Sequence, residues 1–160
     1  DHAGYEATLK RNAEAQKASD GGGGPERRGH ARGQSHPWLV NVAREISAAQ
    51  VAQSARAAQE FGGDGLTATN TTLSRAGVEG ESQAKAQGGL SGAPLRTLAD
   101  ATLRKLRAAV GKDFVLIGVG GIQSGEDAAE KRCAGADLVQ IYTGFIYRGP
   151  ALIGHCAEML

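Results

Sequence analysis

The sequence predicts an α/β protein built on a parallel sheet. Short apolar, β-branched segments alternate with segments of helical periodicity between residues 37 and 160. One of them, FVLIGV at residues 114–119, is almost wholly apolar, which is typical of a parallel strand covered on both faces. Glycines follow the helical segments at the positions where a helix ends. A helix between two strands returns the chain to the same end of the sheet, so the strands are expected to be parallel.

Composition agrees with this class. The 160 residues include 18 basic and 17 acidic side chains and are 41% hydrophobic, which favours one soluble globular domain. A formal charge of +1 provides no field that would attract a phosphate backbone, so no nucleic-acid partner is expected. No apolar run reaches the roughly 18 residues that a membrane span requires, and residues 1–5 resemble no signal peptide.

The chain divides into two parts by composition. Residues 5–18 are compatible with a polar helix, and residues 19–36 contain four consecutive glycines and little that a core can bury. Residues 1–36 are therefore expected to be a helix followed by a poorly ordered, irregular segment, and residues 37–160 a folded domain. A local frameshift in the coding sequence is one hypothesis for the composition of residues 19–36.

The first strand–helix unit begins at residues 38–43, which form a short strand candidate. Ser47 can cap the following helix, which ends at Gly62 and Gly63, and residues 65–69 form the second strand. The side chains expected on the buried face of this helix are Val51, Ala55 and Ala58.

A glycine-containing loop over residues 70–95 precedes two further units. Helices are expected over residues 96–110, 124–134 and 150–160, and strands over residues 114–119 and 138–142. The apolar positions that predict the helix over 96–110 are Leu98, Leu103, Leu106 and Val110. Four units in this length fit half of a (β/α)8 TIM barrel better than an open sheet, because a complete barrel needs about 250 residues.

Ligands of parallel α/β folds bind at the carboxyl ends of the strands. The third strand ends in GVGGI at residues 118–122 and the fourth in YTGF at residues 142–145, and two adjacent glycine-bearing ends favour a phosphate site over a plain tight turn. The second strand ends in TNTT at residues 69–72, whose amide and hydroxyl groups suit a polar planar ligand; a local Asx turn is the alternative.

The sequence provides no catalytic or metal-binding residue with a clear pattern. Cys133 and Cys156 lack the close paired spacing of a zinc site and are expected to be reduced thiols packed as small hydrophobic groups. His155 falls in the last expected helix, and the remaining histidines lie before residue 37. Neutral surface histidines are therefore expected.

The strings at the strand ends together resemble the dihydroorotate dehydrogenases. The resemblance is carried by DG (64–65), ATNTT (68–72), GGLSG (88–92), IGVGGI (117–122), GA (135–136) and LVQIYTGF (138–145). The last string, with Gly149 and Pro150 after it, is similar to the quinone-dependent, membrane-associated class. The resemblance covers residues 37–160 and corresponds to the carboxyl-terminal half of the barrel.

This resemblance implies a function in pyrimidine biosynthesis: FMN-dependent oxidation of dihydroorotate to orotate with a quinone as electron acceptor, at the cytoplasmic face of the cell membrane. It implies substrate contacts for Asn70 and Thr71. The FMN contacts that it implies are Thr69, Gly92, Gly120, Gly121, Tyr142 and Thr143, with Asn41 as a doubtful one.

The sequence also departs from the family. Asn41 stands where the family has a lysine near the flavin, and a neutral amide cannot supply that charge. The catalytic base, a serine in the quinone-linked class, belongs to the preceding half of the barrel, so negligible turnover is expected of residues 1–160 alone. Two alternatives stay open: another phosphate-binding barrel, and a non-catalytic half-barrel fragment that is stable only by pairing with another half.

Overall fold

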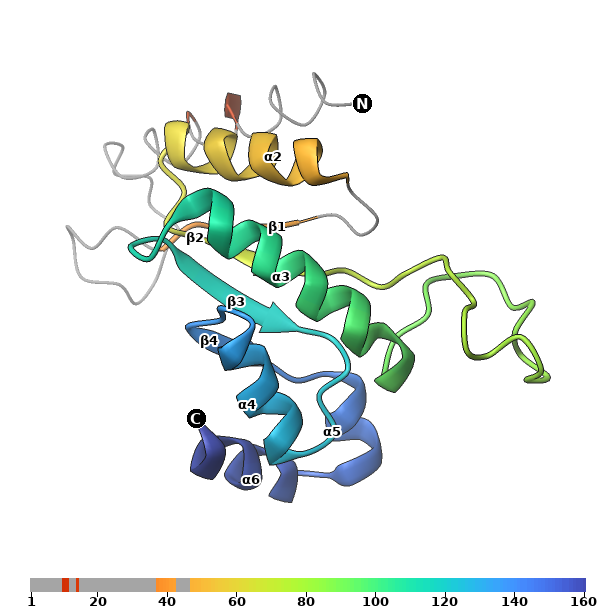
Figure 1. The fold of residues 1–160 in the computed structure, drawn as a ribbon. Coiled ribbons are helices and arrows are strands. Elements are labelled where there is room, and N and C mark those ends of the chain that lie inside the picture. The colour runs from red at the N-terminus through yellow and green to blue at the C-terminus, as the bar shows by residue number, and fades with distance from the viewer. Residues whose placement is uncertain (1–9, 12–13, 15–36, 43–46) are drawn as a thin grey trace, which may run out of the picture.

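The computed structural model describes residues 10–11, 14, 37–42 and 47–160 (Figure 1). The predictions for residues 1–36 lie outside the described residues except at Lys10, Arg11 and Glu14, which are helical and exposed. The division into 1–36 and 37–160 therefore stays a prediction.

The described domain is a half barrel of four parallel strands. Strand β1 spans Leu39–Asn41, β2 Gly65–Ala68, β3 Val115–Val119 and β4 Leu138–Gln140, and the strands are hydrogen-bonded in the order β1-β2-β3-β4. Each pair is parallel, with Val40 opposite Leu66 and Leu66 opposite Leu116. Sequential order of neighbouring parallel strands is the topology of a barrel segment, so the predicted fold class is confirmed.

Helices follow the strands as expected (Figure 1). They are α2 (Ala48–Glu60), the 3₁₀ turn η1 (Ala93–Leu95), α3 (Arg96–Val110), α4 (Gly125–Cys133), α5 (Thr143–Arg148) and α6 (Ala151–Met159). Helices α2 and α3 pack side by side on one face of the sheet, and α4 packs against α6. The sequence predicted no helix over the residues of α5.

Local sequence explains where α2 begins. Ser47 is extended, its hydroxyl accepts a hydrogen bond from the amide of Gln50, and the Gln50 side chain accepts one from the amide of Ser47. This reciprocal capping box satisfies two amide groups that a helix start otherwise leaves unpaired. The predicted cap at Ser47 is confirmed.

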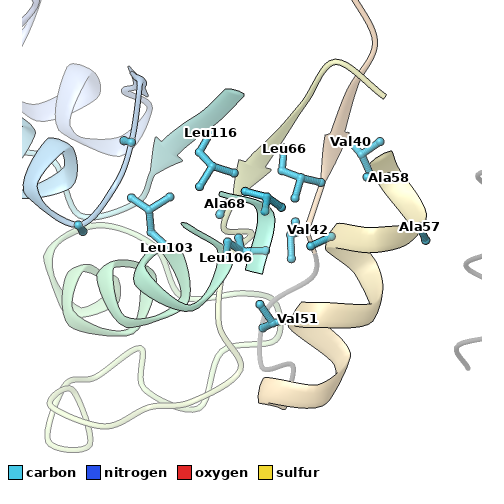
Figure 2. Close-up of a cluster of buried hydrophobic side chains, with 14 residues drawn as sticks. Val40, Val42, Val51, Ala57, Ala58, Leu66, Ala68, Leu103, Leu106 and Leu116 are labelled. Atoms are coloured by element: carbon cyan, nitrogen blue, oxygen red, sulfur yellow. The ribbon is translucent and has the colours of Figure 1, made fainter. Parts of the chain in front are cut away.

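The core lies between the sheet and helices α2 and α3 (Figure 2). Leu66 and Leu116 point from the strands toward Leu103 and Leu106 of α3, and all four side chains are fully buried. The residues that α2 contributes to this cluster are Val51, Ala55, Ala57 and Ala58, which confirms the predicted face.

Three expectations about burial are wrong. Leu98 is 37% exposed, because it precedes Leu103 by five residues and five residues turn a helix by about 140°, away from the buried stripe. Strand β3 is covered on one face only: Val115 is 37% exposed, and Leu138 of the neighbouring β4 is 57% exposed. Side chains from opposite strands fill the interior of a complete barrel, and the described residues contain no opposite strands. Cys133 lies on the exposed side of α4, whereas Cys156 is buried as expected.

Several ion pairs join α3 to the following unit, among them those of Lys131 and Arg107. Lys131 of α4 is fully buried, and its Nζ lies 2.5 Å from Oδ1 of Asp100 on α3. At the other end of α3, Arg107 donates to Oδ2 of Asp137 at 2.5 Å and to the carbonyl of Gly135 at 2.8 Å. The Asp137 carboxylate also accepts a 2.8 Å hydrogen bond from the amide of Leu116. The second pair therefore sits beside the amino ends of β3 and β4.

Within the described residues, no helix is both long enough and apolar enough to cross a lipid bilayer.

Candidate functional site

A cavity of about 200 Å³ lies at the carboxyl ends of the four strands. Its wall is built from the last residues of the strands, from the loops after β2 and β3, and from the start of α5. The lining residues are Asn41, Thr67, Thr69, Asn70, Thr71, Ser91, Gly92, Leu95, Val119, Gly120, Gly121, Ile122, Gln140, Ile141, Tyr142, Thr143 and Gly144.

Every residue that the sequence singled out for ligand contact borders this one cavity. Five separate segments contribute them: the loop before η1 and the ends of β1, β2, β3 and β4. Convergence of the four strand ends follows from the parallel sheet, whose strands all end at the same edge. The structure thus brings the predicted residues together, while the role of each residue stays a prediction.

Thr69 contributes a buried hydroxyl group to this wall. The residue is 5% exposed, and its hydroxyl oxygen has no hydrogen-bond partner among the described residues. Its amide donates to the carbonyl of Val119 at 3.3 Å, which ties the end of β2 to β3. Buried hydroxyl groups are nearly always hydrogen-bonded, so an unpaired one at a cavity wall fits a ligand that supplies the partner.

Asn70 and Thr71 lie next to it on the rim. The Asn70 side-chain oxygen accepts hydrogen bonds from the amide of Thr71 at 2.8 Å and from the Thr71 hydroxyl at 3.4 Å. A local turn, the alternative to a ligand contact, therefore accounts for the hydrogen bonds that the Asn70 side-chain oxygen accepts. The same contacts hold the side-chain amide of Asn70 at the cavity wall, where it is exposed.

Residues 120–123 form the loop after β3, named the glycine loop. Gly121 has φ +81°, and a Cβ atom there would lie 2.8 Å from the backbone nitrogen of Arg96. A side chain is excluded by both the conformation and the space, because L residues rarely adopt this φ. The backbone of the glycine loop therefore packs directly on the first turn of α3.

The loop before η1 meets the start of α5 at the cavity. The Thr143 hydroxyl donates to the Ser91 hydroxyl at 2.9 Å, and a Cβ at Gly92, where φ is +83°, would lie 3.3 Å from Thr143 Cγ2. Only a residue without a side chain gives this approach at that φ. Two segments that lie 52 residues apart in the chain thus form one wall.

Arg75 orders the long loop that leads to Gly92. Its guanidinium donates to the carbonyl oxygens of Ala84, Ala86 and Gly88 at 2.8–2.9 Å. An antiparallel bridge joins Thr72 to Leu90 at the base of the loop. These contacts explain why a glycine-rich segment follows a fixed path to the cavity.

Sequence reasoning missed several lining residues. Thr67 and Gln140 face the cavity because strand side chains alternate and these two lie two residues before Thr69 and Tyr142. Period-two alternation identifies such residues once the cavity-facing side of the strand is known. Ser91 lies inside the GGLSG string that carries the resemblance.

The family model for dihydroorotate dehydrogenase matches residues 5–160. The chain belongs to the dihydroorotate dehydrogenase family. Membership in this family removes the alternative of an unrelated phosphate-binding barrel.

Similar proteins support the assignment. The chain is 55% identical over 124 residues, 78% of its length, to the dihydroorotate dehydrogenase (quinone) of Paracidovorax citrulli strain AAC00-1. It is 52% identical over 130 residues to the dihydroorotate dehydrogenase (quinone) of Acidovorax sp. strain JS42. These matches cover 34% and 37% of the two relatives, so the chain spans about a third of their length.

Solved structures agree with the fold. The crystal structure of the Eimeria tenella enzyme (DHODH) in complex with ferulenol superposes with a TM-score of 0.82 and 27% identity, covering 97% of this chain and 44% of that one. The ligand-free form from the same organism gives a TM-score of 0.79. The dihydroorotate dehydrogenase fold therefore extends over the described half barrel.

Proposed function

We propose that the chain forms the carboxyl-terminal, cofactor- and substrate-facing half of an FMN-dependent dihydroorotate dehydrogenase that passes electrons to a quinone in pyrimidine biosynthesis. One observation carries the proposal: the residues expected to contact FMN and substrate line a single cavity at the carboxyl ends of the strands, and the buried Thr69 hydroxyl there lacks a partner among the described residues. Family membership and the names of the relatives support it.

The glycine-bearing walls suit the phosphate of FMN. Gly120 and Gly121 line the cavity with backbone atoms alone, and Tyr142 and Thr143, which follow β4, line it as well. Backbone amides and hydroxyl groups are suitable donors to phosphate oxygens. Gly92 and Thr69 complete the contacts expected along the cofactor. Bound there, FMN would supply the redox chemistry, as the acceptor of a hydride from dihydroorotate and the donor of electrons to a quinone.

Asn70 and Thr71 are proposed to hold dihydroorotate and orotate. An amide both donates and accepts, and a hydroxyl does the same, which matches a pyrimidine ring that carries N–H groups, carbonyls and a carboxylate. They lie beside Thr69, in the same cavity wall as residues proposed to contact the cofactor. Both side chains thus orient the substrate and leave the redox chemistry to the flavin.

Asn41 lies at the end of β1 and borders the cavity. Its neutral amide can donate a hydrogen bond to a flavin but cannot supply a positive charge to electron density on the reduced ring. Asn41 is therefore proposed as a weak flavin contact.

The proton acceptor of the reaction is proposed to lie in the part of the relatives that this chain does not cover. Among the described lining residues there is no Asp, Glu, His, Lys or Arg side chain, and the hydroxyl oxygen of the lining residue Ser91 already accepts a hydrogen bond from Thr143. His155 lies on α6, outside that lining. A general base must lie within hydrogen-bond reach of the proton that it removes, so residues 1–160 alone are expected to turn over dihydroorotate negligibly.

A peripheral position at the cytoplasmic face of the cell membrane is part of the same proposal, because a quinone is dissolved in the membrane. The second candidate is a non-catalytic half barrel that functions only when it pairs with another half. The open inner face of the sheet, with Val115 and Leu138 exposed, favours it for residues 1–160 in isolation.

FMN titration of purified residues 1–160, followed by quenching of flavin fluorescence, tests the cofactor assignment. The wild-type chain is expected to bind, and Thr69→Val to bind about tenfold more weakly, since it removes the hydroxyl and keeps the shape. Thr97→Val, at an exposed position of α3, is the matched control. A folded chain without FMN binding, or equal affinity of the two variants, would refute the proposal.

A further inference from the structure

Asp127 makes contacts that neither the fold nor the proposed ligand contacts explain. It is the third residue of α4 and only 7% exposed. Its Oδ2 accepts a 2.8 Å hydrogen bond from the amide of Gln123, the last residue of the glycine loop. Its own amide donates to the hydroxyl of Ser124, the N-cap of α4, at 3.3 Å. One side chain thus fixes the point where the glycine loop becomes a helix.

The second carboxylate oxygen of Asp127 reaches another element. Its Oδ1 accepts a hydrogen bond from the guanidinium of Arg96, the first residue of α3. Arg96 also provides the backbone on which Gly121 packs, and it directly follows Leu95 of the cavity wall. The Arg96–Asp127 pair therefore connects the segment that begins at Gly92 with the glycine loop.

Charge also favours this arrangement near an anion. A lone carboxylate behind the glycine loop would repel a phosphate. Arg96 neutralises it, and the hydrogen bond to Asp127 raises the pKa of the Arg96 guanidinium. Neither side chain borders the cavity, so the pair acts on a ligand only through the backbone that it holds.

We propose that Asp127, held by Arg96, is a positioning residue that fixes the glycine loop against the start of α3 and so presets the phosphate-binding wall of the cavity. The ligand part of this inference rests on the proposed function. The loop-fixing part does not, because it concerns the conformation of the chain itself.

The chain contains its own control for a purely structural role. Arg107 and Asp137 form a similar pair, from the same helix α3, and Asp137 also accepts a backbone hydrogen bond. That pair lies beside the amino ends of the strands, at the opposite edge of the sheet from the cavity. Removing either carboxylate charge is expected to lower stability, but only Asp127 is expected to affect the cavity.

The experiment compares Asp127→Asn with Asp137→Asn in residues 1–160. Amide hydrogen exchange, measured by NMR, is expected to become about tenfold faster at Gln123 in the Asp127 variant and to stay unchanged there in the Asp137 variant. FMN affinity is expected to fall about tenfold in the Asp127 variant alone. Arg96→Gln removes the other half of the pair and is expected to repeat both results if Asp127→Asn does not fold.

The outcomes separate the two proposals. Equal exchange at Gln123 in the two Asp variants overturns the inference, whatever the flavin titration gives. Faster exchange without any FMN binding by the wild-type chain supports the fixed loop and refutes the proposed function. Faster exchange with unchanged FMN affinity overturns the positioning role.

Discussion

The buried pair between Lys131 and Asp100 gives the sharpest stability prediction. Lys131 has no exposed surface, the Asp100 side chain is 8% exposed, and their charged atoms are 2.5 Å apart. Burial lowers the pKa of the Lys131 ammonium, and the hydrogen bond from Lys131 to Asp100 opposes that shift. Replacing Lys131 by Met keeps an unbranched side chain, one atom shorter, and leaves a buried carboxylate without its cation.

The expected loss follows from that burial. Breaking a buried ion pair on one side costs about 3–5 kcal/mol, against about 0–1 kcal/mol for a surface pair. With a urea m-value of about 2 kcal/mol per molar, the unfolding midpoint of Lys131→Met is expected to fall by about 2 M. The double variant Lys131→Met, Asp100→Leu replaces both charges by apolar groups and is expected to recover most of the loss.

Urea unfolding followed by circular dichroism measures these midpoints. Lys105→Met, at an exposed position of the same helix as Asp100, is the control and is expected to change the free energy of unfolding by less than about 0.5 kcal/mol. If Lys131→Met unfolds at the midpoint of Lys105→Met, the pair is solvated and the reasoning from burial is wrong.

Two other features of the described chain give testable outcomes. Burial raises the pKa of the Cys156 thiol and shields the thiol from solvent. A thiol reagent at neutral pH is therefore expected to modify Cys133 quickly and Cys156 only on unfolding. Two fast-reacting thiols in the folded wild type would contradict this. Ser47→Ala removes the acceptor for the Gln50 amide and is expected to lower the free energy of unfolding by about 1 kcal/mol in urea titrations. Ser82→Ala, in an exposed loop, is its control, and equal midpoints would show that the cap contributes nothing.

Local signals were sufficient for the order and type of the elements. Apolar runs and helical spacing placed β2, β3, α3 and α4 within one or two residues of their observed bounds, because the residues that start and end them act locally. Ser47 and Gly111 are such residues: a hydroxyl that caps the start of α2, and a glycine with φ +77° that ends α3. The short helix α5 ends at such a glycine, Gly149 with φ +69°, but no capping side chain marks its start.

The membership of the candidate site was also readable from sequence. Parallel strands end at one edge, so TNTT, GVGGI and YTGF were expected to meet there, and the residues chosen from them do border one cavity. Thr67 and Gln140 were not chosen, because alternation along a strand has meaning only once its cavity-facing side is known.

By itself the sequence determined a parallel α/β half barrel, its family and the glycine-bearing ends of its strands, because these depend on residue type and spacing along the chain. Only the tertiary structure decided that Arg96 meets Asp127 across 31 residues, that Lys131 is a buried ion rather than a surface one, and that Leu98 is exposed. Such contacts depend on how α3 and α4 pack on the sheet, and packing brings together side chains whose separation in sequence carries no periodic signal.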